Sequence, residues 1–159
     1  MTANTPSVPV AHGRKAQKME AEVVIHCPPD EVYAFWRDFR NLSRFMDSVE
    51  SVEWTQDQRV SRWHVRGPLG IDMKWDAVII NDHPGSLIAW ETLHNSDMPS
   101  AGSVRFDPMD EPGWTRVRLT VDYYPPGGAL AVALAALLYA DPERVVEQDL
   151  KRLKVVLEG

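Results

Sequence analysis

Residues 19–39 read MEAEVVIHCPPDEVYAFWRDF, and this stretch decides the predicted fold. Apolar and polar side chains alternate through most of its first half, which is typical of a strand with one buried face. The motif Pro28-Pro29-Asp30-Glu31 follows: proline suits the first turn of a helix, and acidic side chains suit the positive end of the helix dipole. Apolar residues then recur at positions 32, 35, 36 and 39, the spacing of one helical face. The stretch therefore predicts a strand that leads directly into an amphipathic helix.

A second short helix is predicted from Asn41 to Phe45, and a run of about six strands follows it. The strands are predicted from alternating apolar and polar residues at 49–55, 60–66, 71–80, 88–92, 103–107 and 116–123. Turn residues such as Gly67-Pro68 join them, and the short connections leave no room for crossover helices. The pattern predicts an antiparallel sheet with one wet face and one dry face.

The end of the chain has the pattern of a long helix. Asp141-Pro142-Glu143 suits a helix start, and an apolar stripe follows at Val146, Leu150, Leu153 and Leu157. Because Pro142 would clash inside a continuous helix, we expect a break near residues 139–141. The sheet must bury its dry face and the helix its stripe, so we expect the sheet to curl around this terminal helix.

Five short motifs punctuate this order of elements. They are IHCPPDEVY at 25–33, DFRNLSRFM at 38–46, WDA at 75–77, IAW at 88–90 and GSVRF at 102–106. In this order they resemble the START-like (SRPBCC) superfamily, in its branch of polyketide cyclases/dehydrases and coenzyme Q-binding proteins, over residues 19–157. The resemblance implies an α+β helix-grip fold. In that fold a curved antiparallel sheet of about seven strands wraps around a long C-terminal helix, with two short helices after the first strand.

The resemblance also implies a cavity between the sheet and the terminal helix that holds a lipid, a quinone or a polyketide-like molecule. The superfamily includes both carriers and enzymes, so two classes of function stay open. Binding or transport of a small hydrophobic ligand is our preferred hypothesis, because an apolar wall alone gives useful affinity. The alternative is a cyclase or dehydratase that acts on a polyketide-like substrate.

Four tryptophans at positions 36, 63, 75 and 90 fall on predicted dry faces. Core packing explains them without any ligand, and in a small domain core and pocket wall overlap. We therefore predict one set of inward-facing side chains as ligand-binding. This set is Trp36, Phe39, Phe45, Met46, Trp63, Met73, Trp75, Trp90, Phe106, Leu130, Leu134 and Leu137.

The segment from Gly127 to Tyr139 is the most apolar part of the chain. A helix that is apolar nearly all round needs cover on more than one side, and the sheet covers only one. We therefore expect a lid that is stabilised by a ligand, a second subunit or a membrane surface. A third class of function follows, a partner- or membrane-docking module that acts through residues 129–139. The apolar run is too short to span a bilayer.

Motifs for nucleophilic, metal and phosphate chemistry are missing from the sequence. It has no GxSxG motif, no HExxH or HxH spacing and no P-loop. His94 and Asp97 lie in a predicted loop and could form an acid–base pair, although exposed loop residues of these types are more often solvated. His26 and His64 fall on the wet face of the sheet. We therefore assign no catalytic residue, no metal and no cofactor.

Composition and charge indicate which partners and which cellular location to expect. The net charge of −6 argues against sequence-independent nucleic-acid binding, since phosphate contacts need a cationic surface. Cys27 is the one cysteine, so no internal disulfide is possible, which favours a cytoplasmic location. Residues 1–17 are polar and lack the apolar core of a signal peptide, so we predict a disordered tail followed by a single ligand-binding domain at 18–159.

Overall fold

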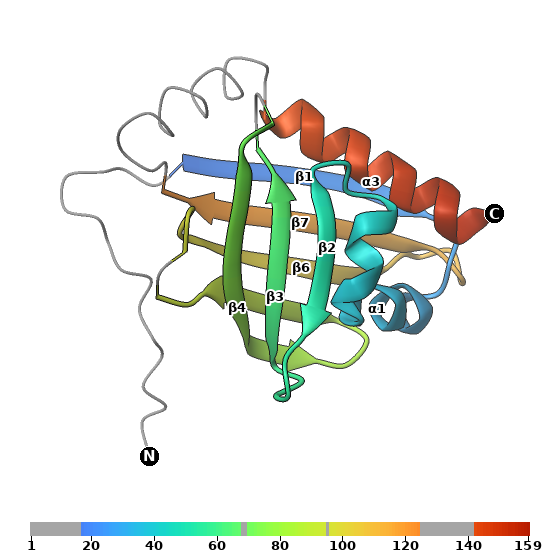
Figure 1. Cartoon of the computed structure of the whole chain (residues 1–159). Helices are drawn as coiled ribbons and strands as arrows, with labels where there is room; N and C mark the ends of the chain where they lie inside the picture. The colour runs from blue at the N-terminus through green and yellow to red at the C-terminus, as the bar shows by residue number, and fades with distance from the viewer. Residues whose placement is uncertain (1–16, 68–69, 95, 125–141) are drawn as a thin grey trace.

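A computed structural model describes residues 17–67, 70–94, 96–124 and 142–159 of the chain. Within these residues the chain forms one seven-stranded antiparallel sheet, two short helical segments and a long C-terminal helix (Figure 1). The elements in chain order are β1 (Gln17–Ile25), α1 (Pro29–Arg37), η1 (Phe39–Arg44), β2 (Val49–Trp54), β3 (Val60–Arg66), β4 (Asp72–His83), β5 (Leu87–Thr92), β6 (Ser100–Pro108), β7 (Thr115–Tyr123) and α3 (Pro142–Glu158). The predicted α+β helix-grip fold is confirmed.

The strands follow the order β1-β7-β6-β5-β4-β3-β2, and every neighbouring pair is antiparallel. Strands β2 to β7 form a meander, in which each strand pairs with the next along the chain. β1 returns to pair with the last strand, so that Gln17 lies opposite Tyr123 and Ile25 opposite Thr115. The sheet is curved, and Figure 1 shows β2, β3 and β4 standing in front of β6, β7 and β1. The core lies in the concavity.

The proline motif starts α1 as the sequence predicts. The carbonyl of Pro28 accepts the backbone N–H groups of Glu31 and Val32, which closes the first turn. After Arg37, Asp38 adopts an extended backbone that ends α1, and its carboxylate accepts the N–H of Arg40. This cap starts η1 at Phe39, so the predicted second helix is a 3-10 segment that begins two residues earlier than expected.

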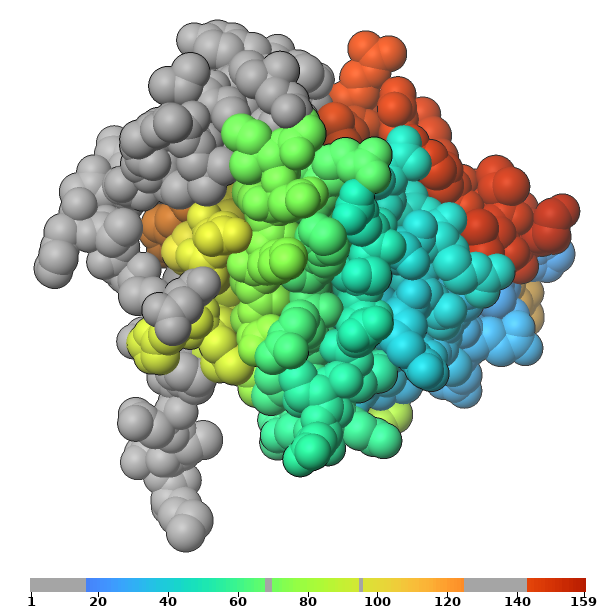
Figure 2. Space-filling model, viewed as in Figure 1, coloured from blue at the N-terminus to red at the C-terminus, as the bar shows by residue number. Residues whose placement is uncertain are grey.

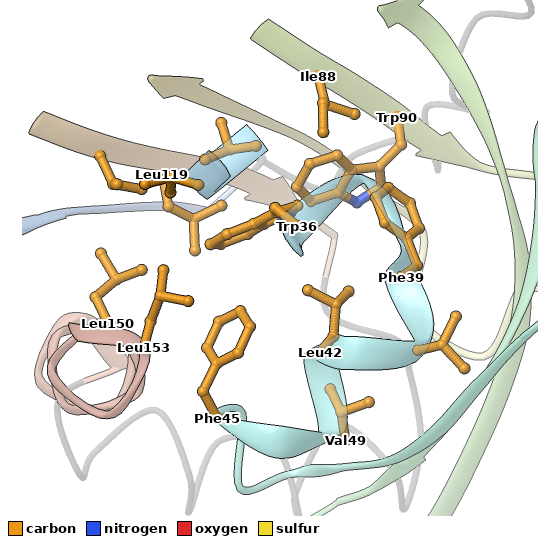
Figure 3. Packing of buried hydrophobic residues seen from close by; sticks show 14 of the residues in the cluster. Trp36, Phe39, Leu42, Phe45, Val49, Ile88, Trp90, Leu119, Leu150 and Leu153 are labelled. Atoms are coloured by element: carbon orange, nitrogen blue, oxygen red, sulfur yellow. The ribbon is translucent and has the colours of Figure 1, made fainter. Parts of the chain in front are cut away.

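Helix α3 packs along β1 and buries the predicted apolar stripe. Leu150 and Leu153 are fully buried, and Val146 and Leu157 pack against the core while staying partly exposed. Figure 3 shows Leu150 and Leu153 pointing from the helix into the concavity. The sheet face and the helix stripe thus bury one another, as the alternation of residues predicts.

Polar contacts fix the C-terminal half of α3 to the rest of the fold. The Lys154 ammonium donates to the carbonyl of Val24 at 3.0 Å, and the Glu158 carboxylate accepts the backbone N–H of His26 at 3.1 Å. Both contacts reach the end of β1, so they set the position of the helix along that strand.

Several boundaries differ from the predicted ones. β4 continues to His83, beyond the predicted end at Ile80, through a bulge between Ile79 and Asn81. β1 begins at Gln17, the last residue of the predicted tail. Residues 1–16, the predicted lid from Gly127 to Tyr139 and the predicted break near residues 139–141 lie outside the described residues. The tail and the single domain therefore remain predictions.

Candidate functional site

The concave face of the sheet gathers aromatic side chains from η1 and three strands. The ring of Phe39 meets Trp63 and Trp90 edge-on, with centroids 5.8 and 5.6 Å apart. Trp63 in turn stacks on Trp75 at 6.0 Å and on Trp90 at 6.5 Å. Alternation alone puts the three tryptophans on the dry face, and the strand order β5-β4-β3 brings them together.

A second aromatic group surrounds α1. The indole of Trp36 packs against Phe45 at 5.1 Å and against Phe106 at 6.2 Å, which joins α1 to the η1 end and to β6. Both aromatic groups belong to a single hydrophobic cluster that also contains Leu150 and Leu153 of α3 (Figure 3).

The structure brings together the nine predicted pocket residues that it describes. Met46 and Trp75 are partly exposed, and the other seven are buried: Trp36, Phe39, Phe45, Trp63, Met73, Trp90 and Phe106. Leu130, Leu134 and Leu137 lie outside the described residues. The burial fits a packed core as well as a pocket wall, so the ligand-binding role of these residues remains a prediction.

One glycine makes room for the aromatic surface. Gly102 lies opposite Trp90 in the register of β5 and β6, and a Cβ on Gly102 would lie 2.5 Å from Cζ2 of Trp90. No side chain fits at that distance, so the indole covers the backbone of β6 directly. The glycine of the GSVRF motif therefore shapes the concave wall.

Polar groups on the concave face are largely satisfied within the protein. Ser61 accepts the indole N–H of Trp63 at 2.8 Å, and Thr92 Oγ1 accepts the backbone N–H of Ser100 at 3.0 Å. The indole N–H of Trp36 differs, because Trp36 is 0% exposed and its Nε1 has no acceptor. An unpaired buried donor is unfavourable by about 1–3 kcal/mol, so this N–H is a point where an additional acceptor would stabilise the protein.

Three surface hollows lie away from this aromatic interior. One borders β1, β7 and Glu147, one lies between α1 and Trp54, and one lies beside Met109 and Trp114. None of these three is lined by a predicted pocket residue. The chemistry of the concave face is therefore separate from these hollows.

A buried carboxylate lies where α3 meets the turn after η1. Asp149 is 7% exposed, and its carboxylate accepts a hydrogen bond from Arg152 Nη1 at 2.6 Å. Arg152 also donates to Asp47 and to the carbonyl of Phe45, which ties α3 to this turn. Burial is the main cause that raises the pKa of Asp149 from its ordinary 3.8 to about 6, and it outweighs the opposing effect of Arg152.

This raised pKa predicts how stability depends on pH. Folding favours the protonated form of Asp149, so its contribution is fully present below about pH 4 and is lost as pH rises through about 6. Between those values the wild type should lose up to roughly 3 kcal/mol of unfolding free energy relative to Asp149→Asn. Urea unfolding of both proteins across this range measures the difference. A difference independent of pH would mean that Asp149 titrates normally.

In the described residues of the loop after β5, no hydrogen bond or ion pair joins His94 to Asp97, so the acid–base pair that the sequence left open gains no support. The Asp97 carboxylate accepts the backbone N–H of Lys74 at 2.9 Å, which ties the loop to β4, and His94 is exposed. Asp97 thus has a structural partner other than His94. Asp149 was not predicted as a site residue, because its signal in the sequence is no more than an acidic residue beside the apolar stripe of a helix.

Comparison with known proteins identifies similar chains. A family model described as polyketide cyclase / dehydrase and lipid transport matches residues 16–158. No curated protein matches the chain. Within the part of the chain that the structure describes, no helix is both long enough and apolar enough to cross a bilayer.

Several solved structures share the fold. The DR_A0006 protein of Deinococcus radiodurans is 29% identical, with a TM-score of 0.68 over 87% of this chain and 95% of that one. The ZhuI aromatase/cyclase of Streptomyces sp. R1128 is 21% identical, with a TM-score of 0.73 over 91% and 94%. A START superfamily protein of Mycobacterium smegmatis is 14% identical, with a TM-score of 0.66 over 91% and 98%. At these last two identities the likeness concerns the fold alone.

Proposed function

We propose that this protein binds a small hydrophobic molecule between its sheet and α3. The chain belongs to the polyketide cyclase / dehydrase and lipid transport family of the START-like superfamily, and the proposal starts from that membership. The family supports a hydrophobic ligand-binding or cyclase role. The finer choice, a carrier rather than an enzyme, is our proposal. Its main support is the apolar and aromatic character of the concave face.

The part of that face that is not fully buried is the expected contact surface. Trp75 of β4 and Val121 of β7 pack against the core and yet remain partly exposed, although both are apolar, as does Met98 of the loop before β6. A ligand that loses ~300 Å² of apolar surface there gains roughly 7 kcal/mol before the entropic losses of binding. That gain is enough for useful affinity without charged anchoring groups. Docking through residues 129–139 and a cytoplasmic location remain predictions.

Binding of an apolar fluorescent probe tests this proposal. We expect N-phenylnaphthylamine to bind the folded protein at one equivalent and to quench tryptophan emission, because Trp75 borders the expected contact surface. Trp75→Phe should weaken binding and reduce the quenched fraction. Trp114→Phe is the matched control, since Trp114 lies away from the concave face. Its ring stacks on that of His26, with the two centroids 4.4 Å apart. Absence of binding, or equal effects of the two variants, would contradict the proposal.

The cyclase alternative is favoured by one observation, the carboxylate of Asp149. A buried carboxyl with a pKa of about 6 is suited to proton transfer near neutral pH. If the protein is a cyclase, a linear poly-β-ketone mimic should be converted by the wild type and not by Asp149→Asn, while probe binding survives in both. If it is a carrier, neither protein converts the mimic, and native mass spectrometry of the purified wild type should detect a bound small molecule.

A further inference from the structure

The outer face of β2, β3 and β4 carries a cluster of side chains that the proposed function does not use. Glu50, His64 and Asp72 come from these three strands, one from each, and one ligand atom of each lies within 4.8 Å of the others. This side of the sheet, opposite the aromatic interior, faces the viewer in Figure 2. The cluster combines an imidazole with two carboxylates, the nitrogen and oxygen donors of many transition-metal sites.

The imidazole of His64 lies between the two carboxylates. Its Nδ1 is 3.4 Å from Glu50 Oε2, and its Nε2 is 3.5 Å from Asp72 Oδ1. The Nε2 atom is itself buried and has no hydrogen-bond partner, although a carboxylate oxygen lies so near. The proximity of Asp72 is therefore not explained by a hydrogen bond to this nitrogen.

We propose that Glu50, His64 and Asp72 bind a divalent transition-metal ion, with zinc as the best fit. Two ligands of one tetrahedral zinc ion lie about 3.3 Å apart when both bonds measure 2.0–2.1 Å. The 3.5 Å between His64 Nε2 and Asp72 Oδ1 matches that separation. Glu50 Oε2 lies beside Nδ1, the other ring nitrogen, so Glu50 completes a set of three protein ligands only after rotation of its side chain. Water fills the remaining position. The inference is independent of the proposed function, because the cluster lies outside the concave face.

Arg66 lies beside this cluster. Its Nε donates to Glu50 Oε1 at 2.9 Å, and Oε2 of the same carboxylate faces His64 Nδ1 at 3.4 Å. When the side chain of Glu50 rotates towards the ion, its carboxylate therefore exchanges the contact with Arg66 for the metal.

This cluster could not be predicted from the sequence, for a geometric reason. The positions 50, 64 and 72 have no local spacing in common, so no metal motif appears along the chain. The sheet register brings them together: β2 pairs with β3 through an irregularity between Val49 and Ser51, and Asp72 lies diagonal to His64 across β3 and β4. Glu50 lies within that irregularity, where a strand changes the direction of its side chains.

Titration calorimetry with zinc chloride tests the proposal on the full chain. We expect the wild type to bind one equivalent with micromolar affinity, and His64→Ala to bind about tenfold more weakly or worse. Glu50→Gln and Asp72→Asn should each weaken binding. His83→Ala is the matched control, because His83 is an exposed histidine at the far end of β4. Cobalt(II) should give the visible absorption of a tetrahedral site in the wild type and lose it in His64→Ala.

Two results would overturn the site. If the wild type shows no saturable zinc binding, the cluster is a set of surface ion pairs only. If His64→Ala binds zinc as tightly as the wild type, the ion is held elsewhere in the chain. Circular dichroism of each variant shows whether the fold is retained, and Asp72→Asn supplies a milder change should His64→Ala fail to fold.

Discussion

Replacing Trp36 by alanine is expected to lower the free energy of unfolding by about 3–5 kcal/mol, as for other large buried aromatic side chains. Trp36 is 0% exposed, and its indole joins α1 to Phe45 and to Phe106. Alanine removes these ring contacts and leaves a cavity between α1 and the sheet that the surrounding side chains fill only partly. Urea unfolding, followed by circular dichroism, measures the loss.

The matched variant is Trp36→Phe, which keeps an aromatic ring and removes the N–H. Because the indole Nε1 has no acceptor, the phenylalanine variant loses no hydrogen bond, although it loses part of the buried volume. We expect it to be destabilised by about 1–2 kcal/mol, clearly less than the alanine variant. Equal losses in the two variants would mean that the N–H has an acceptor in solution, such as a buried water or a bound ligand. A loss below about 1 kcal/mol in Trp36→Ala would contradict the packing of α1 on the sheet.

Residue alternation was sufficient to predict the sheet, and the places where it fell short have physical causes. In β3 the pattern is strict, since Trp63 and Val65 are buried and Arg62 is exposed, so both faces were assigned correctly. In β4 the alternation stops at Ile80, where the chain turns polar. The strand continues because the bulge lets Asn81–His83 pair with β5. Alternation cannot predict a bulge, because a bulge adds one residue that has no partner on the neighbouring strand, and the two-residue period does not mark where that residue lies.

Of the candidate sites, the aromatic interior could be predicted from the sequence, whereas Asp149 and the cluster on the outer face could not. The aromatic interior could be predicted, because apolar residues on a dry face meet wherever the sheet curls. The burial of Asp149 could not, because it arises where α3 meets the turn after η1, whose Asp47 is far away in the sequence and donates its backbone N–H to Asp149 at 3.5 Å. The cluster of Glu50, His64 and Asp72 depends on the register of three strands, and register is a property of the assembled sheet.

Replacing Leu150 by alanine is expected to lower the free energy of unfolding by about 2–5 kcal/mol, because a fully buried leucine leaves a cavity where α3 meets the core. Leu150 points into the concavity beside Leu153 (Figure 3), and both are 0% exposed. Alanine is the better helix former, so the loss cannot come from helix propensity.

Val155→Ala is the matched control, because it changes the same helix at a side chain that is 69% exposed. We expect this control to change stability by no more than about 0.5 kcal/mol, as surface substitutions usually do. Urea unfolding of both variants measures the contrast between the buried and exposed sides of α3. If Leu150→Ala changed stability no more than Val155→Ala, the stripe of α3 would not be packed on the sheet, and the concave face would lack the helix that closes it.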